Sequence, residues 1–236
     1  MRIVVYTAVI GGIDPLWSAL PDPAEYVAFV DATKPEVGLW GGNPPAILGN
    51  TQHIGAPPTW KQRVVSIEGD ARRTARMVKT LPHRFMPDAD VWVWVDSNVR
   101  LRIVAAEAVR RWLKGDIAIP NHPDRRDVYQ EAEACVKFRK DDAKTLQRQA
   151  RRYALDGHPR GWGLAETRIV IRRNTPAIRA LNEAWWAEID AGSNRDQVAL
   201  PYVCWQQGLR WDVIPGRVNG NGHKQVWHAK HTGRRR

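Results

Sequence analysis

The most constraining stretch of the chain is Val91–Val95, where valine and tryptophan alternate without a polar residue. A run that is apolar on both faces predicts a strand buried inside a largely parallel sheet. Asp96, Ser97 and Asn98 follow it directly, and all three carry oxygen donors. Because ligands of parallel sheets bind at the carboxyl ends of strands, we predict a metal–diphosphate site at Asp96 and Asn98. Mg²⁺ and Mn²⁺ both favour such oxygen ligands. An ordinary turn would use the same residue types, so the motif alone leaves both interpretations open.

Segments typical of strands and helices alternate along the whole chain. The predicted strands are residues 2–7, 26–31, 63–67, 91–95, 116–120, 167–172 and 210–214. The predicted helices are residues 71–80, 105–114, 127–139, 142–155, 176–189 and 193–205. This order predicts an α/β fold, Rossmann-like, with a mostly parallel sheet flanked by helices in a single domain over residues 1–214. Residues 34–59 are predicted to be an irregular surface excursion, and residues 215–236 a basic, histidine-rich tail.

Charge and composition narrow the partners and the compartment. A formal net charge of +11 suits a phosphate-bearing ligand, a nucleic acid or an anionic polymer. No apolar run approaches the ~20 residues that cross a bilayer, and the N-terminus looks like a strand rather than a signal peptide. We therefore predict a cytoplasmic protein without a membrane partner. The two cysteines, Cys135 and Cys204, lie far apart, which argues against a zinc knuckle.

Four further positions are candidates for binding or catalysis. Arg76 and Lys79 share a face of their predicted helix with Arg72, either toward a phosphate or carboxylate or as a solvated face. Asp31 ends a strand, where it either accepts from a ribose or base or caps a turn. His122 follows another strand and is a candidate acceptor-side hydrogen bonder or base.

Several stretches, taken in order, resemble one known family. They are Tyr6-Thr7-Ala8 with Gly11-Gly12 and Asp14, Asp31, Arg76 to His83, Asp96-Ser97-Asn98, His122 with Tyr129 and Glu131, Gly163 to Asn174, Trp185-Trp186, and Arg195-Asp196-Gln197. Over roughly residues 3–214 this set resembles the glycosyltransferase-like domain of plant mucilage-related proteins and of uncharacterised bacterial and phage proteins. The resemblance implies a nucleotide-sugar-dependent glycosyltransferase with a GT-A-like fold.

The resemblance also implies roles for individual residues. Tyr6, Thr7 and Ala8 would hold the nucleotide base, Asp31 the base or ribose, and Arg76, Lys79 and Ser97 the rest of the donor. Asp96 and Asn98 stand at the Asp-x-Asp motif of GT-A enzymes, although an amide at Asn98 weakens a divalent site. Asp196 and Gln197 match the Asp–Gln pair beside the donor sugar in the retaining group. His228 or His231 would complete the shell of a Mn²⁺ or Mg²⁺ ion. We expect a UDP-sugar as donor and an acceptor that is an anionic polymer or DNA.

Two other classes of protein fit part of the same sequence. The net charge and the histidines of the tail would suit a metal-dependent nuclease or another phosphoryl-transfer enzyme, but a carboxylate pair at a known spacing is missing. A non-catalytic nucleic-acid-binding protein would gather its cations with aromatic residues, whereas here they are spread over several predicted helices. A glycosyltransferase whose acceptor is DNA would combine the two interpretations.

Overall fold

The chain is built on one seven-stranded sheet in the order β3-β2-β1-β4-β7-β6-β8. The computed structural model describes residues 1–11, 16–17, 19, 22–32, 60–67, 70–216 and, for the backbone alone, 226–228. The strands of the sheet are β1 (Ile3–Val9), β2 (Glu25–Asp31), β3 (Lys61–Val65), β4 (Val91–Val95), β6 (Ile117–Pro120), β7 (Ile169–Arg173) and β8 (Asp212–Ile214). The predicted excursion at 34–59 lies outside the described residues.

The direction of β7 is what distinguishes this sheet from a fully parallel one. β1 pairs in parallel with β2 and β4, β2 with β3, and β6 with β8. β7 lies between β4 and β6 and is antiparallel to both. Within the described sheet β7 alone runs against the other strands, so the prediction of a mostly parallel sheet is confirmed. The start of β7, rather than its end, lies beside the carboxyl end of β4, since Ile169 pairs with Val95.

The helices begin close to where their sequence signals predict, except for the short α2, which was not predicted. They are α1 (Ala71–Thr80), α2 (Pro82–Phe85), α3 (Ala105–Trp112), α4 (Val128–Lys137), α5 (Ala143–Leu155), α6 (Pro176–Asp190) and α7 (Asp196–Gln206). Asp70 caps α1 by accepting from the amide of Arg73, and Thr175 caps α6 by accepting from that of Ile178. A side-chain oxygen at the N-cap satisfies an amide that has no partner inside the helix, which explains these starting points.

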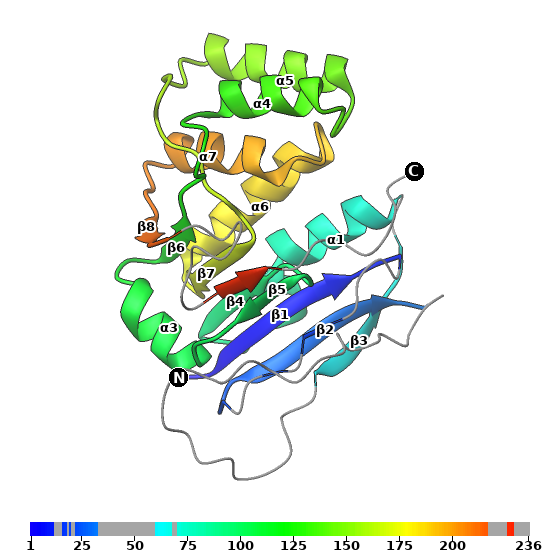
Figure 1. Cartoon of the computed structure of the whole chain (residues 1–236), viewed down its shortest axis with the longest axis vertical. Helices are drawn as coiled ribbons and strands as arrows, with labels where there is room; N and C mark the ends of the chain where they lie inside the picture. The colour runs from blue at the N-terminus through cyan, green and yellow to red at the C-terminus, as the bar shows by residue number, and fades with distance from the viewer. Residues whose placement is uncertain are drawn as a thin grey trace.

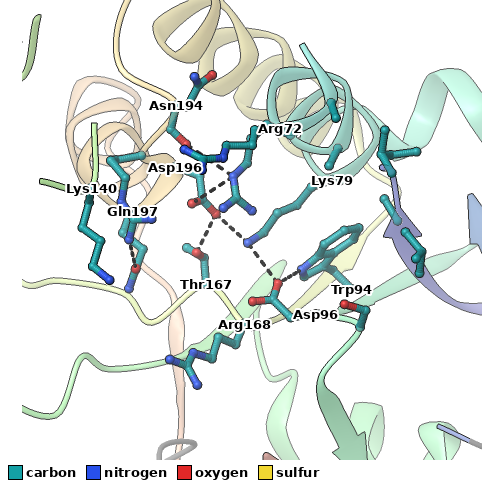
Figure 2. A pocket seen from close by; sticks show the side chains of 18 residues that line it. Arg72, Lys79, Trp94, Asp96, Lys140, Thr167, Arg168, Asn194, Asp196 and Gln197 are labelled. Atoms are coloured by element: carbon teal, nitrogen blue, oxygen red, sulfur yellow. Dashed lines mark hydrogen bonds and ion pairs between the residues drawn. The ribbon is translucent and has the colours of Figure 1, made fainter. Parts of the chain in front are cut away.

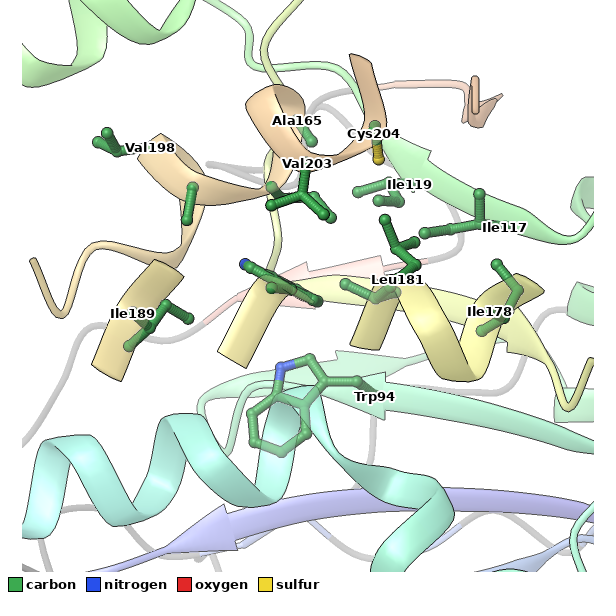
Figure 3. Close-up of a cluster of buried hydrophobic side chains, with 14 of the residues drawn as sticks. Trp94, Ile117, Ile119, Ala165, Ile178, Leu181, Ile189, Val198, Val203 and Cys204 are labelled. Atoms are coloured by element: carbon green, nitrogen blue, oxygen red, sulfur yellow. The ribbon is translucent and has the colours of Figure 1, made fainter. Parts of the chain in front are cut away.

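Two apolar cores cover the two faces of the sheet, and β4 contributes to both. Trp92 and Trp94 point into the core beneath α1, α6 and α7, whereas the three valines of β4 point into the core beneath α3. Figure 3 shows Trp94 between the sheet and α6, with Leu181 and Val203 continuing the core toward α7. All five residues of β4 are buried, so the prediction of a strand with two buried faces is confirmed.

A helical hairpin, α4–α5, forms a further layer beyond α7 (Figure 1), and α4 packs against both α5 and α7. Near the C-terminus, the predicted tail contains a short strand, β9 (Val226–His228). It pairs antiparallel with β5 (Val99–Leu101), the strand that begins directly after Asn98. No helix in the described ranges is long and apolar enough to cross a membrane.

Candidate donor site

A cavity of about 260 Å³ opens where the carboxyl ends of β1 and β4 meet α1, the start of β7 and the start of α7. We call it the central cavity (Figure 2). Its cations are Arg72, Arg76, Lys79, Lys140, Arg168 and Arg195. Its carboxylates are Asp96 and Asp196. The excess of cations over carboxylates makes the lining electropositive, as a site for an anionic ligand requires.

Lys79 links the two carboxylates of the central cavity. Its side chain is 1% exposed, and its ammonium lies 2.5 Å from Asp196 Oδ2 and 3.7 Å from Asp96 Oδ1 (Figure 2). The ammonium also lies 5.3 Å from the centre of the Trp94 ring, whose Nε1 donates to Asp96 Oδ1 at 2.8 Å. Burial lowers the pKa of Lys79, and the two carboxylates oppose that shift.

Asp196 is the most strongly held acid of the site. It is 2% exposed; Thr167 donates to its Oδ2 at 2.6 Å, and Arg76 Nε lies 3.5 Å from its Oδ1. Burial alone would raise the pKa of Asp196, but the charges of Arg76, Lys79 and Arg195 outweigh it and hold that pKa well below its usual value. The carboxylate is therefore ionised at physiological pH and cannot act as a general acid.

A buried guanidinium beneath the cavity fixes the backbone that carries Lys79. Arg172 is fully buried and donates to the carbonyl of Lys79 at 2.6 Å and to that of Thr80 at 3.2 Å. Tyr6 donates its hydroxyl to the same Lys79 carbonyl at 2.7 Å. These carbonyls belong to the last turn of α1, where no intrahelical donor remains, so a cation there satisfies them and suits the helix dipole.

Seven of the predicted site residues line the central cavity. They are Ala8, Arg76, Lys79, Asp96, Ser97, Asp196 and Gln197. Gln197 is oriented by donating its Nε2 to the carbonyl of Ala165 at 3.1 Å. The helical face shared by Arg72, Arg76 and Lys79 thus borders the cavity, with Arg72 itself exposed to solvent.

Five other predicted site residues lie outside its lining. Tyr6 and Thr7 are fully buried beneath it, and Asp31 is buried while accepting from the amide of Gly11 at 2.6 Å. Asn98 is 1% exposed and does not reach the cavity. Both ring nitrogens of His122 are engaged, Nδ1 by the amides of Asp124 and Arg125 and Nε2 by the Arg125 guanidinium. Burial, followed by Arg125, lowers the pKa of His122.

Sequence reasoning missed Thr167, Arg168, Lys140, Asn194 and Arg195 in the lining. Thr167 and Arg168 precede β7, and a parallel sheet would have placed them at the opposite edge. Only the antiparallel direction of β7 brings them to the carboxyl ends of β1 and β4. Lys140 comes from the α4–α5 turn, a position without a sequence signal. For Arg195, the adjacent Asp196-Gln197 pair was the available signal.

The described residues do not by themselves form a site suited to a divalent ion. They contain no cluster of three histidine, cysteine, aspartate or glutamate side chains. Of the predicted ligands Asp96 and Asn98, only Asp96 faces the cavity, and the ammonium of Lys79 already lies near it. The backbone of His228 pairs with Val99, next to Asn98, while His231 lies outside the described residues. The Mn²⁺ or Mg²⁺ ion therefore stays a prediction that depends on this late segment.

Comparison with known proteins agrees with the chemistry of the cavity. Residues 23–213 match the family described as TOD1/MUCI70, glycosyltransferase-like domain. The chain belongs to this family. It is also 28% identical, over 145 residues, to the probable hexosyltransferase MUCI70 of Arabidopsis thaliana. That match covers 57% of this chain but only 25% of the length of the relative. The predicted family is thereby confirmed, and the cavity lies within the matched residues except for Ala8, Val9 and Ile10 at the carboxyl end of β1.

Proposed function

We propose that this member of the TOD1/MUCI70 family transfers a hexose from a nucleotide-diphosphate sugar, bound in the central cavity, to an acceptor. The observation that carries the proposal is the meeting of the α1 cations with Asp96 and Asp196 at the carboxyl edge of the sheet. A sheet of this kind, with its ligand site at that edge, supports a GT-A-like assignment. A UDP-sugar is the donor we propose first.

The residues of the cavity divide the chemistry between the leaving group and the sugar. As the sugar–oxygen bond breaks, negative charge grows on the diphosphate, and cations fixed in place stabilise it without reorganisation. Arg76 and Lys79 are held by Asp196, and Arg168 is held by Glu166, whose Oε1 lies 3.3 Å from Arg168 Nε. On the sugar, positive charge develops as the bond breaks. The oxygens of the Asp196 carboxylate and the Gln197 amide are the groups that would stabilise this charge.

A thermal-shift screen of UDP, GDP, CMP and dTDP sugars, with Mn²⁺ or with EDTA, tests the proposal. We expect one nucleotide family to raise the melting temperature. A larger shift with Mn²⁺ would support the predicted ion at Asp96, and an equal shift in EDTA would assign the diphosphate to the cations of α1. The absence of a shift with every donor would contradict the proposed function.

The Asp96→Ala variant gives the matching mutational test. The side chain of Asp96 is 27% exposed at the cavity, so it is not part of the buried core. Its removal should therefore leave the fold intact while abolishing turnover of the donor. Asp88→Ala is the control, because Asp88 is an 81% exposed carboxylate far from the cavity lining. Wild-type turnover in Asp96→Ala would show that the donor site has been placed wrongly.

The acceptor is the less defined half of the reaction. We propose an anionic polymer or DNA, because a formal net charge of +11 favours an anionic partner. The nuclease alternative has less support, since the sequence lacks a carboxylate pair at a known spacing and the matching family is described as a glycosyltransferase-like domain.

A further inference from the structure

The outer hairpin of the fold, α4–α5, carries a row of exposed cations that ends in the central cavity. The exposed basic residues from the end of α4 through α5 are Lys137, Arg139, Lys140, Lys144, Arg148, Arg151 and Arg152, of which Arg152 is paired with Glu188. Lys144, Arg148 and Arg151 follow one another at helical spacings of four and three, so they share one face of α5. Arg148 and Arg151 have no carboxylate partner in the part of the chain that the structure describes. Lys140, in the turn, already lines the cavity.

A basic helical face is often no more than a solvated surface. In the turn of this hairpin, however, an arginine occupies a backbone conformation that is unfavourable for any residue except glycine. Arg139 has φ of 50°, and it is the single non-glycine residue with positive φ among the described residues. It occupies the position after the helix cap where glycine is usual, with its amide bonded to Val136 O and that of Lys140 to Cys135 O. An L-residue there is strained, and strained residues that persist concentrate at functional sites.

The groove between α4 and α5 adds an apolar floor to this row of cations. Ala132, Val136 and Ala150 line the groove together with Lys137 and Arg151. Glu133 is the one carboxylate in that lining. At the cavity end of α4, Phe138 is 60% exposed, with the ammonium of Lys137 5.8 Å from its ring centre. Cations along a groove combined with an exposed aromatic ring are the features with which proteins bind single-stranded nucleic acid.

We propose that the α4–α5 hairpin binds a single-stranded nucleic acid and leads it across Arg139 and Lys140 into the central cavity, so that the acceptor is a nucleotide of that strand. This rests on the proposed function for its last step, the transfer of the sugar, but not for the binding itself. The phosphates lie against the cations of α5, and a base stacks on Phe138. The same surface would not favour a neutral glycan, because such a glycan has no negative charge to pair with the cations.

The test measures fluorescence anisotropy of a fluorescein-labelled 20-nucleotide DNA strand with the full-length chain as salt is varied. We expect binding at about 50 mM salt, with affinity falling steeply as salt rises. Arg148→Glu/Arg151→Glu should weaken binding at least tenfold and flatten the salt slope by about one to two, since two phosphate contacts are lost. The matched control is Arg111→Glu/Lys114→Glu, which makes the same charge change at two exposed positions at α3 and should stay within twofold of wild type.

Arg139→Gly separates binding from folding. Glycine relieves the positive φ, so the melting temperature should stay equal or rise while binding to the strand weakens. Phe138→Ala should weaken binding with little change in the salt slope, because stacking is lost and no phosphate contact is.

Three results would overturn the inference: no binding at 50 mM salt, equal weakening by the α3 control, or polygalacturonate outcompeting the oligonucleotide at equal charge concentration. The last result would assign the surface to an acidic polysaccharide. Thermal shifts by nucleotide sugars on the same variants keep this outcome distinct from the proposed function. If those shifts persist while the strand does not bind, the acceptor surface is wrong and sugar transfer stands; if neither ligand binds, both fail.

Discussion

At the scale of single residues, the central feature is a lysine and an aspartate that are both buried and both charged. Lys79 and Asp196 are 1% and 2% exposed, and each carries further partners from α1, β4 or the segment before β7. Removing charges from water is costly, so such a pair adds little net stability, yet breaking it leaves an unpaired charge inside the protein. Because breaking the pair costs much more than forming it contributes, Asp196 holds the ammonium of Lys79 in a fixed position.

Lys79→Met should therefore lower the free energy of unfolding by about 3 kcal/mol, the lower end for a broken buried pair, because Arg76 remains near Asp196. Urea denaturation measures the change. Lys61→Met is the control, since Lys61 is 68% exposed in its pair with Glu25 and should cost less than about 1 kcal/mol. The double variant Lys79→Met/Asp196→Asn should recover part of the loss, and an additive double variant would argue against direct coupling of the two charges.

Acid should weaken the protein through the same carboxylate. The folded-state pKa of Asp196 is lowered, so the unfolded chain takes up the proton first as pH falls. Its contribution is complete above about pH 4, the unfolded value, and is lost as pH falls below it toward the lower folded-state pKa. Urea denaturation at pH 6, 5, 4 and 3 should give a smaller decline in Asp196→Asn than in wild type. Equal slopes would show that other carboxylates account for the acid sensitivity.

At the scale of elements, α1 places three cations on the cavity, and its two ends are secured in different ways. Asp70 caps its start, whereas Arg172 and Tyr6 hold the carbonyls of its last turn. The buried end sets where Lys79 projects. The exposed N-cap contributes chiefly to the stability of the helix.

Asp70→Ala should lower the free energy of unfolding by about 1 kcal/mol, because the amide of Arg73 loses its side-chain acceptor. Asp70→Asn retains an acceptor and should cost much less. Chemical denaturation of both variants makes the comparison. A similar loss in the two would show that the negative charge near the helix start, and not the hydrogen bond, is what Asp70 supplies.

At the scale of the whole molecule, segments up to 129 residues apart in the chain meet beside the predicted metal ligands. β9 pairs with β5 so that the backbone of His228 lies opposite Val99. If Mn²⁺ binds here, calorimetric titration should show that His228→Ala abolishes the binding, while His223→Ala, outside β9, preserves it. A wild-type chain that binds no Mn²⁺ would contradict the predicted ion and leave the cations of α1 as the ligands of the proposed diphosphate.

The sequence by itself determined the elements and those residues of the central cavity that belong to local patterns. The buried run Val91–Val95, the cap Asp70 and the cap-proline pair Thr175-Pro176 depend on contacts within a few residues, and each predicted element forms there. The sequence also predicted which side chains share a helical face, because Arg76 and Lys79 must lie on the same side of any helix that contains them.

Only the tertiary structure decided the direction of β7, the burial of Asn98 and the position of the α4–α5 turn. Strand direction depends on how the connecting segments return the chain to the sheet, which the periodicity of a strand does not record. Hence Thr167, Arg168 and Lys140 escaped prediction, and His122, although it follows a strand, is bound by Arg125 outside the cavity. Local sequence thus specifies which side chains face one way together, whereas long-range pairing specifies what they face.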